Sequence, residues 1–260
     1  MKRRLLIVMT WLMAGTCSIT YAQAGLTGEG LAAQTPATTQ SQPQAQPKPG
    51  PAETPALATL KAKAEAGDVA SANKLGDMYG IGSGVPRNLV MAAKWFRIAA
   101  EGGDSTAQVK IGLMYLAGFG VQRDVKVALS WYNKSAAQGN KEAMLQLARL
   151  YESGTDVQKD VRESLKWYQQ AGERGDVEAQ LKVAIMYHDG DGTERDYKEA
   201  MKWFKKAAEK ESYEAEFSIG DMYEQGQGVV ANPDEAAHWY TLAKQHGSVA
   251  AQTRLRNLGR

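Results

Sequence analysis

Residues 186 to 196 read MYHDGDGTERD, in which one histidine and four acids surround two glycines. Imidazole and carboxylate groups gathered on a glycine-containing loop are the ligands that zinc or calcium would need. The stretch does not follow the calcium loop of an EF-hand, however. Counted from Asp189, the sixth position of that loop requires glycine, and this sequence has Glu194 there.

The same stretch has a structural explanation, because it is one of five similar segments spaced 36 residues apart. It aligns with MYGIGSGVPRN, MYLAGFGVQRD, LYESGTDVQKD and MYEQGQGVVAN. The alignment makes Asp196 an N-cap, whose carboxylate binds backbone N–H groups of its own helix. The side chains specific to this segment are His188, Asp189, Asp191 and Glu194. We interpret them as an acidic patch on a solvated loop, with a metal site and a partner surface as alternatives.

Catalytic chemistry lacks its usual residues in this sequence. The chain contains three histidines and a single cysteine, and it has neither a G-x-S-x-G nor an H-E-x-x-H motif. Its G-x-G segments follow predicted helices, whereas a dinucleotide-binding fingerprint follows a strand. We therefore predict no catalytic residue, no metal ligand and no cofactor.

The 36-residue period extends through most of the chain. Five tryptophans follow it (Trp95, Trp131, Trp167, Trp203 and Trp239), as do five tyrosines (Tyr79, Tyr115, Tyr151, Tyr187 and Tyr223). Each unit also contains two stripes of apolar residues with helical spacing, as at Ala107, Ile111, Met114 and Tyr115. A ligand-binding box of aromatic rings is an alternative, but regular spacing of this kind favours a core between paired helices.

Residues that begin and end helices recur with the same period. Gly67, Gly103, Gly139, Gly175 and Gly247 can end a helix in the left-handed conformation, and the next residue in each case is Asp, Asn or Ser, which can cap the following helix. The second helix of each unit should begin after Asn88, Asp124, Asp160, Asp196 or Asn232. Glutamates three residues after the last three of these predict an acidic capping box.

Two positions depart from the pattern. Asp156 replaces a turn glycine, and we expect it to adopt the left-handed conformation with little strain, because Asp tolerates that conformation better than most residues. Glu211 replaces a glycine that ends a helix. Glutamate does not favour the left-handed conformation, so we expect a longer or differently shaped turn there.

The repeat resembles the Sel-1-like repeat family, a branch of the tetratricopeptide superfamily. The resemblance is most complete in AQVKIGLMYLAGFGVQRDVKVALSWYNKSAAQG, residues 107–139. It implies an all-α fold over residues 57–260, a right-handed superhelix, or solenoid, of about five helix-turn-helix repeats. The repeats fall at about 67–102, 103–138, 139–174, 175–210 and 211–246, with capping helices over 57–66 and 248–258.

The first residues predict export. A basic start, an apolar run from Leu5 to Ala14 and the cleavage motif Ala22-Gln23-Ala24 are typical of a secretory signal peptide over residues 1–24. Lipidation of Cys17 is disfavoured, because Thr16 rather than a small residue precedes it, so the cysteine would be removed with the signal. We expect a periplasmic protein, with secretion as the alternative.

Residues 25–56 are rich in Pro, Gln, Thr and Ala and have no aromatic residue, which predicts a disordered tether. Removal of residues 1–24 takes away Lys2, Arg3 and Arg4, so 31 Lys+Arg become 28 against 29 Asp+Glu, a net charge of −1. This balance argues against nucleic acid as a partner. Nothing in the mature sequence predicts an integral membrane segment, and the sequence does not indicate an oligomeric state.

In tetratricopeptide-like solenoids the first helices line a concave groove. Carried onto this sequence, the resemblance implies twelve partner-binding positions: Val109, Leu113, Leu116, Leu145, Arg149, Glu152, Leu181, Ile185, His188, Phe217, Asp221 and Glu224. The alternative for several of them is packing between adjacent repeats.

We therefore predict an exported, non-catalytic scaffold or adaptor that binds a protein or peptide partner in this groove. One alternative is a periplasmic immunity protein that neutralises a secreted toxin, a role that the resemblance also allows. Another is an enzyme acting on peptidoglycan or a β-lactam. Cysteine-rich members of the family suggest that activity, but this chain lacks their paired cysteines.

Overall fold

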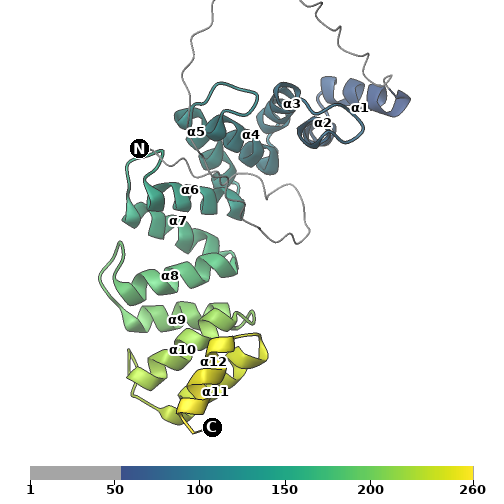
Figure 1. Ribbon diagram of the computed structural model, residues 1–260. Helices are drawn as coiled ribbons and strands as arrows, with labels where there is room; N and C mark the ends of the chain where they lie inside the picture. The colour runs from purple at the N-terminus through teal and green to yellow at the C-terminus, as the bar shows by residue number, and fades with distance from the viewer. Residues whose placement is uncertain (1–53, 260) are drawn as a thin grey trace, which may run out of the picture. The chain divides into compact units, whose positions relative to one another are not determined.

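The structure is a computed structural model and describes residues 54–259 (Figure 1). The predicted signal peptide over 1–24, including Cys17, and residues 25–53 of the predicted tether lie outside the described part. Pro55 and Ala56, the last residues assigned to the tether, belong to the first helix.

Twelve helices and no strand make up residues 54–259, and each helix packs against the next one along the chain (Figure 1). None of these helices is long and apolar enough to cross a membrane. The helices are α1 (Pro55–Glu65), α2 (Val69–Ile81), α3 (Leu89–Glu101), α4 (Ser105–Ala117), α5 (Val125–Ala137), α6 (Lys141–Ser153), α7 (Val161–Glu173), α8 (Val177–Asp189), α9 (Tyr197–Ala208), α10 (Tyr213–Gln225), α11 (Pro233–Gln245) and α12 (Val249–Asn257). The pairs α2/α3, α4/α5, α6/α7, α8/α9 and α10/α11 form repeats 1 to 5.

The predicted helix starts are confirmed. Every first helix follows an Asp, Asn or Ser whose side chain accepts a hydrogen bond from a backbone N–H in the first turn. In repeat 2, the N–H of Ala107 lies 2.7 Å from Asp104 Oδ1. Because such a cap satisfies an N–H that has no partner within the helix, it fixes where the helix begins.

The second helices are capped differently from the predicted capping box. The Asp160 side chain accepts from the N–H of Glu163 at 3.0 Å, as expected. The reciprocal bond is missing, because the N–H of Asp160 donates to the carbonyl of Tyr151 in the preceding helix. Glu163 therefore pairs with Lys166 at 2.8 Å. The N-cap thus joins the two helices of one repeat, which a purely local box would not do.

The repeated aromatic side chains contribute to the core, as predicted, but to different extents. Trp95 and Trp203 are buried, whereas the other three repeated tryptophans and the five repeated tyrosines are partly buried. The aromatic residue that follows each repeated tryptophan is buried in every repeat, as at Tyr132, Tyr168 and Tyr240. The buried residues fall into three clusters that follow the order of the repeats, the largest extending from Val109 to Met222. Such a sequence of local cores is expected where each repeat packs only against its neighbours.

The small residue at the eighth position of each first helix lets an aromatic ring approach the backbone. A Cβ added to Gly112 would lie 2.8 Å from the Tyr132 ring, and one added to Gly220 would lie 2.6 Å from the Tyr240 ring. Repeats 3 and 4 carry Ala148 and Ala184 at this position. The glycines therefore set the closest approach of the two helices in their repeats.

The expectation for Asp156 is wrong. Among residues 54–259, Glu211 is the one residue other than glycine with a positive φ, so Asp156 does not take the left-handed conformation. The corresponding Gly120 shows why a side chain does not fit: its Cβ would lie 2.2 Å from the carbonyl oxygen of Leu89 in the preceding repeat. Asp156 follows another backbone path, and its carboxylate accepts a hydrogen bond from Arg123.

The expectation of a longer turn at Glu211 is confirmed, although Glu211 takes the left-handed conformation itself, with φ 61°. The α9 helix ends at Ala208, so the turn before α10 covers residues 209–212 and is one residue longer than the turns over 102–104, 138–140 and 174–176. The bond from the N–H of Ser212 to the carbonyl of Ala207 corresponds to the one from Asp104 to Ala99. Packing on both sides of the turn therefore holds a conformation that costs a glutamate about 1 to 2 kcal/mol.

Candidate functional site

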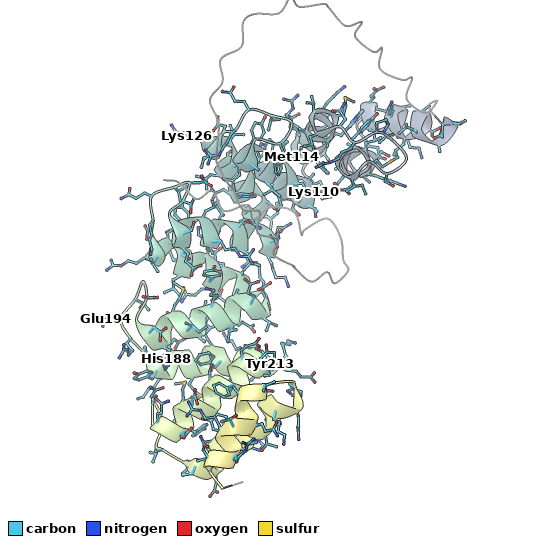
Figure 2. All side chains as sticks on the ribbon, in the orientation of Figure 1. Lys110, Met114, Lys126, His188, Glu194 and Tyr213 are labelled. Carbon is cyan, nitrogen blue, oxygen red and sulfur yellow. The ribbon has the colours of Figure 1, made fainter. Side chains whose placement is uncertain are left out.

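The first helices of neighbouring repeats meet along one face. We call it the first-helix face and define it by the sixth, ninth and twelfth residues of α2, α4, α6, α8 and α10, together with Arg254 of α12. Figure 2 labels two of its side chains, Lys110 and His188. Eight of the twelve predicted partner-binding residues lie at its ninth and twelfth positions, and the other four are at the fifth.

Ion pairs connect three of the helix junctions on this face. Across repeats 1 and 2, Lys110 Nζ lies 2.7 Å from Asp77 Oδ1. Across repeats 3 and 4, Lys182 Nζ lies 3.2 Å from Glu152 Oε1. Arg254 Nη2 of α12 lies 3.2 Å from Asp221 Oδ1 of repeat 5. Since all these side chains are partly exposed, each pair contributes about 1 kcal/mol or less, but its charges are matched within the chain.

The other two junctions are bridged near the turns that join the paired helices. Arg123 Nη2 pairs with Asp156 between repeats 2 and 3. His188 Nε2 lies 2.9 Å from Gln227 Oε1 between repeats 4 and 5. At these junctions the sixth position of the following first helix is Gln146 or Ser218 instead of a cation. The first-helix face therefore has no sixth-position ion pair there.

The side chains that remain on the face at repeats 2 and 4 are apolar. Leu113 and Ile185 occupy the ninth position, where repeats 1, 3 and 5 have Asp77, Arg149 and Asp221. Ile185 is 39 % exposed, and Leu113 is half-buried. The ninth position thus alternates between charged and apolar residues along the solenoid.

Two tyrosine hydroxyls of the second helices bond to carboxylates of this face. Tyr168 Oη donates to Glu152 Oε2 at 2.8 Å. Tyr240 Oη lies 2.5 Å from both Asp221 Oδ1 and Glu224 Oε2. Burial, followed by these hydrogen bonds, raises the pKa of both tyrosines well above the usual range. The acids at the twelfth position are thus used within their own repeats.

Tyr132 of repeat 2 has no such acceptor. The residue is fully buried, and its hydroxyl has no hydrogen-bond partner among the described residues. Leu116 stands at the twelfth position, where Glu152 and Glu224 stand in repeats 3 and 5. Burial raises the pKa of Tyr132, and the negative charge of Glu142 adds a smaller effect in the same direction.

The structure divides the predicted partner-binding residues into three groups. Val109 and Leu145 are buried in the core, as the packing alternative holds. The charged residues have partners within the chain, including Arg149, whose Nη2 lies 2.7 Å from Glu178 Oε1. The partly accessible apolar residues that remain are Leu113, Leu116, Leu181, Ile185 and Phe217, of which Leu116, Leu181 and Phe217 also pack against the core.

The acidic patch of repeat 4 is not gathered around one point. His188 Nδ1 lies 2.6 Å from Asp189 Oδ1, and the ring packs edge-on against Tyr197 with centroids 5.2 Å apart. Within residues 54–259, no three His, Cys, Asp or Glu side chains are arranged to hold a metal ion. His188 instead bridges two repeats through Gln227.

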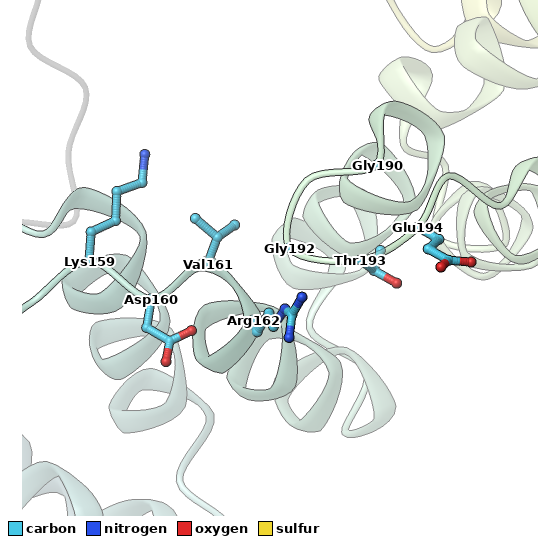
Figure 3. Close-up of a pocket in the computed structure, with 8 residues that line it drawn as sticks. All are labelled: Lys159, Asp160, Val161, Arg162, Gly190, Gly192, Thr193 and Glu194. Atoms are coloured by element: carbon cyan, nitrogen blue, oxygen red, sulfur yellow. The ribbon is translucent and has the colours of Figure 1, made fainter.

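An open depression of about 710 Å³ lies beside this patch (Figure 3). Its walls are the start of α7 and the turn after α8, and Asp160 is already engaged as the N-cap of α7. Lys159, Asp160 and Arg162 lie on the α7 side and Glu194 on the turn after α8, so that two cations and two anions line it (Figure 3). The lining residues are Lys159, Asp160, Val161, Arg162, Gly190, Gly192, Thr193 and Glu194.

Sequence reasoning missed two features of the first-helix face. The alternation at the ninth position could have been found by comparing every second repeat in the sequence. The unpartnered hydroxyl of Tyr132 could not have been found in this way, because the hydrogen bonds of a buried hydroxyl depend on the side chains that surround it in the fold.

The helices and the alternating face define an α-solenoid built from Sel1-type units. The Sel1 repeat family model matches residues 69–104, 105–140, 141–176, 177–212 and 214–248. The chain therefore belongs to the Sel1 repeat family, whose repeats typically serve as scaffolds for protein–protein interaction.

Two solved structures are similar to this chain over about three quarters of its length. One is a protective antigen of uropathogenic Escherichia coli with an SLR fold, at 30 % identity and a TM-score of 0.69, covering 77 % of this chain and 43 % of the antigen. The other is a Sel1 repeat protein from Oxalobacter formigenes, at 31 % identity and a TM-score of 0.67, covering 76 % and 82 %. This chain thus spans less than half of the antigen. No curated protein matches the sequence.

Proposed function

We propose that this protein is an exported, non-catalytic adaptor that binds a partner protein through its first-helix face. One observation carries the proposal: ion pairs within the chain engage charged groups of that face at three junctions, while Leu113 and Ile185 remain partly accessible between them. Apolar side chains on a face where most charged groups are already paired gain most from a partner that covers them.

The assignment as non-catalytic rests on how the histidines are used. His188 bridges two repeats, and His246 Nδ1 lies 2.8 Å from Glu216 Oε1, a carboxylate that is almost fully buried. His238 is exposed beside the Trp239 ring. Among the described residues, the hydrogen bonds of these histidines go to Asp189, Gln227 and Glu216 and not to a Ser or Thr hydroxyl that they could activate as a nucleophile. A nitrocefin or muropeptide hydrolysis assay tests this, and turnover by the purified mature protein would refute it.

Export is proposed from the sequence of residues 1–24. In a bacterial host with a general secretion pathway, the full chain should be cleaved after Ala24, giving a protein that begins at Gly25. Fractionation followed by N-terminal sequencing tests this. Uncleaved protein in the cytoplasm would refute it.

Partner binding is tested by substituting the two apolar ninth positions together. Purified mature protein carrying Leu113→Asp and Ile185→Asp should lose a stoichiometric partner that the unmodified chain retains from an envelope extract. Val230→Asp is the matched control, because Val230 is apolar and 88 % exposed but lies in a turn. Circular dichroism establishes that both variants are folded. Equal retention by both variants would refute binding through this face.

A further inference from the structure

Repeat 2 has a buried hydrogen-bond donor without an acceptor, next to apolar surface. In repeats 3 and 5 the tyrosine at the eighth position of the second helix donates to the twelfth residue of the first helix. Repeat 2 keeps the donor, Tyr132, but has Leu116 in place of the acceptor. Leu116 therefore takes the position that a carboxylate residue has in the other two repeats.

The side chains around this position favour an uncharged ligand. Leu113 and Leu116 offer half-buried apolar surface, and Gln146 replaces the cation that meets the acid in the neighbouring repeats. Glu142 is close enough to affect the charge state of Tyr132 and accepts a hydrogen bond from Gln146 Nε2. A carboxylate brought beside Glu142 would meet a like charge, whereas a neutral carbonyl would not.

An unsatisfied hydroxyl is more than a neutral packing choice. Phenylalanine occupies the same position in repeats 1 and 4, as Phe96 and Phe204, and both rings are buried there. The same framework therefore accepts a ring without a hydroxyl. Tyr132 keeps a buried donor that destabilises the free protein and becomes useful only when something supplies an acceptor.

We propose that Tyr132, Leu113, Leu116 and Gln146 form a specific peptide-binding site, here called the repeat-2 site. Its ligand is an uncharged, apolar segment of the partner protein. A backbone carbonyl of the segment accepts the Tyr132 hydrogen bond while its side chains cover Leu113. The Leu116 side chain moves aside to admit the carbonyl, since the hydroxyl is covered in the free protein. This site deepens the proposed function and rests on it.

The test uses a phage-displayed library of random 12-residue peptides selected on the purified mature chain. Selected peptides are synthesised with a fluorophore, and their affinities for variants are measured by fluorescence anisotropy. Leu116→Glu places an acceptor within the chain, as in repeat 3, and should weaken binding at least about tenfold. Tyr132→Phe should weaken it about 3- to 10-fold, the effect of one hydrogen bond. Tyr168→Phe is the matched control and should leave binding unchanged.

The outcomes separate this inference from the proposed function. Apolar peptides of near-zero charge, sensitive to Leu116→Glu and Tyr132→Phe, support the repeat-2 site. Peptides insensitive to both variants but lost with Ile185→Asp overturn the site and leave the first-helix face intact as a binding surface. Peptides insensitive to all of these variants overturn both. Acidic peptides that bind Tyr132 would also overturn the proposed chemistry.

Discussion

Repeats 2 and 3 have the same framework and different first-helix faces. Both place a tyrosine, Tyr132 or Tyr168, at the same helical position and bury it completely. In repeat 3 the hydroxyl bonds to Glu152, which also pairs with Lys182 of the next repeat. In repeat 2 the hydroxyl has no hydrogen-bond partner among the described residues, and Leu116 takes the position that Glu152 has in repeat 3.

The difference shows how one repeat can serve either the fold or a partner. Repeat 3 satisfies its polar groups within the chain, which fixes its contact with repeat 4. Repeat 2 leaves its donor and its apolar side chains uncommitted, and its polar bridges to repeat 3 lie elsewhere, between Arg123 and Asp156 and between Asn140 and Ser105. The contrast between the two tyrosine hydroxyls comes from one residue, the twelfth of the first helix, which is Leu116 in repeat 2 and Glu152 in repeat 3.

The largest effect should come from giving repeat 2 the turn residue of repeat 3. Gly120→Asp would place a Cβ 2.2 Å from the Leu89 carbonyl oxygen in a left-handed conformation. Because backbone cannot move aside as a side chain does, we expect a loss of about 3 kcal/mol in the free energy of unfolding. Urea denaturation measures it. Asp156→Gly is the control and should cost under about 1 kcal/mol; equal losses would contradict the explanation.

The two tyrosine hydroxyls should have opposite effects on stability. Tyr168→Phe leaves Glu152 without its hydrogen-bond donor and should lower the free energy of unfolding by about 1.5 kcal/mol. Tyr132→Phe removes an unsatisfied buried hydroxyl and should raise it by about 1 kcal/mol. Chemical denaturation of the two variants side by side measures both changes. The same sign for both substitutions would show that the Tyr132 hydroxyl has an acceptor after all.

Alkaline pH should destabilise both repeats. The pKa of Tyr132 and of Tyr168 is raised on folding, so the folded state keeps these protons after the unfolded chain begins to lose them near pH 10. Stability is therefore retained below pH 10 and falls above it, by up to about 1.4 kcal/mol per pH unit for each tyrosine. Thermal unfolding between pH 9 and pH 11 (about one unit each side of that value) measures the slope. Each Tyr→Phe substitution should reduce it by a similar amount, and an unchanged slope would contradict the burial of the hydroxyls.

The smallest effect concerns the turn between repeats 4 and 5, where Glu211 replaces the glycine that ends the same helix in repeats 2 and 3. Glu211→Gly should raise the free energy of unfolding by about 1 kcal/mol, because glycine adopts a positive φ without a steric penalty. The gain in the free energy of unfolding is smaller than the strain energy of Glu211, since glycine also increases the conformational entropy of the unfolded chain. Gly139→Ala, at the equivalent turn of repeat 2, should have the opposite sign. A destabilising Glu211→Gly would mean that the Glu211 side chain contributes to the turn.

The helices could be predicted from sequence because each boundary depends on nearby residues. Asp104 needs only the N–H of Ala107 to cap α4, and the 36-residue period shows the same event in every repeat. The two irregular turns could not be predicted in this way. The propensity of each residue type for the left-handed conformation disfavours it at Glu211 and favours it at Asp156, and both outcomes are the reverse. The neighbouring helices impose the backbone path in both turns, and residue propensity does not take those contacts into account.

The candidate site was predictable in its position and less so in its composition. The repeat register placed Leu113 and Ile185 on the first-helix face, where they are accessible to different degrees. It also selected Val109 and Leu145, which are buried, since register does not say how far a neighbouring repeat covers a position. The ion pairs join residues about one repeat apart, such as Lys182 and Glu152. Only the fold therefore shows that these charged side chains are paired within the chain.

His188 links repeats 4 and 5 at the turn edge. Repeats 2 and 3 are linked at the turn edge by Arg123 and Asp156 and again at the start of their first helices, where Asn140 Nδ2 donates to Ser105 Oγ at 3.2 Å. A joint held at one edge can act as a hinge, because rotation about the fastening separates the opposite side without breaking it. Joints held across the first-helix face, by Lys110 or Lys182, resist that rotation. Bending of this solenoid should therefore be uneven, with the most compliant joint after repeat 4.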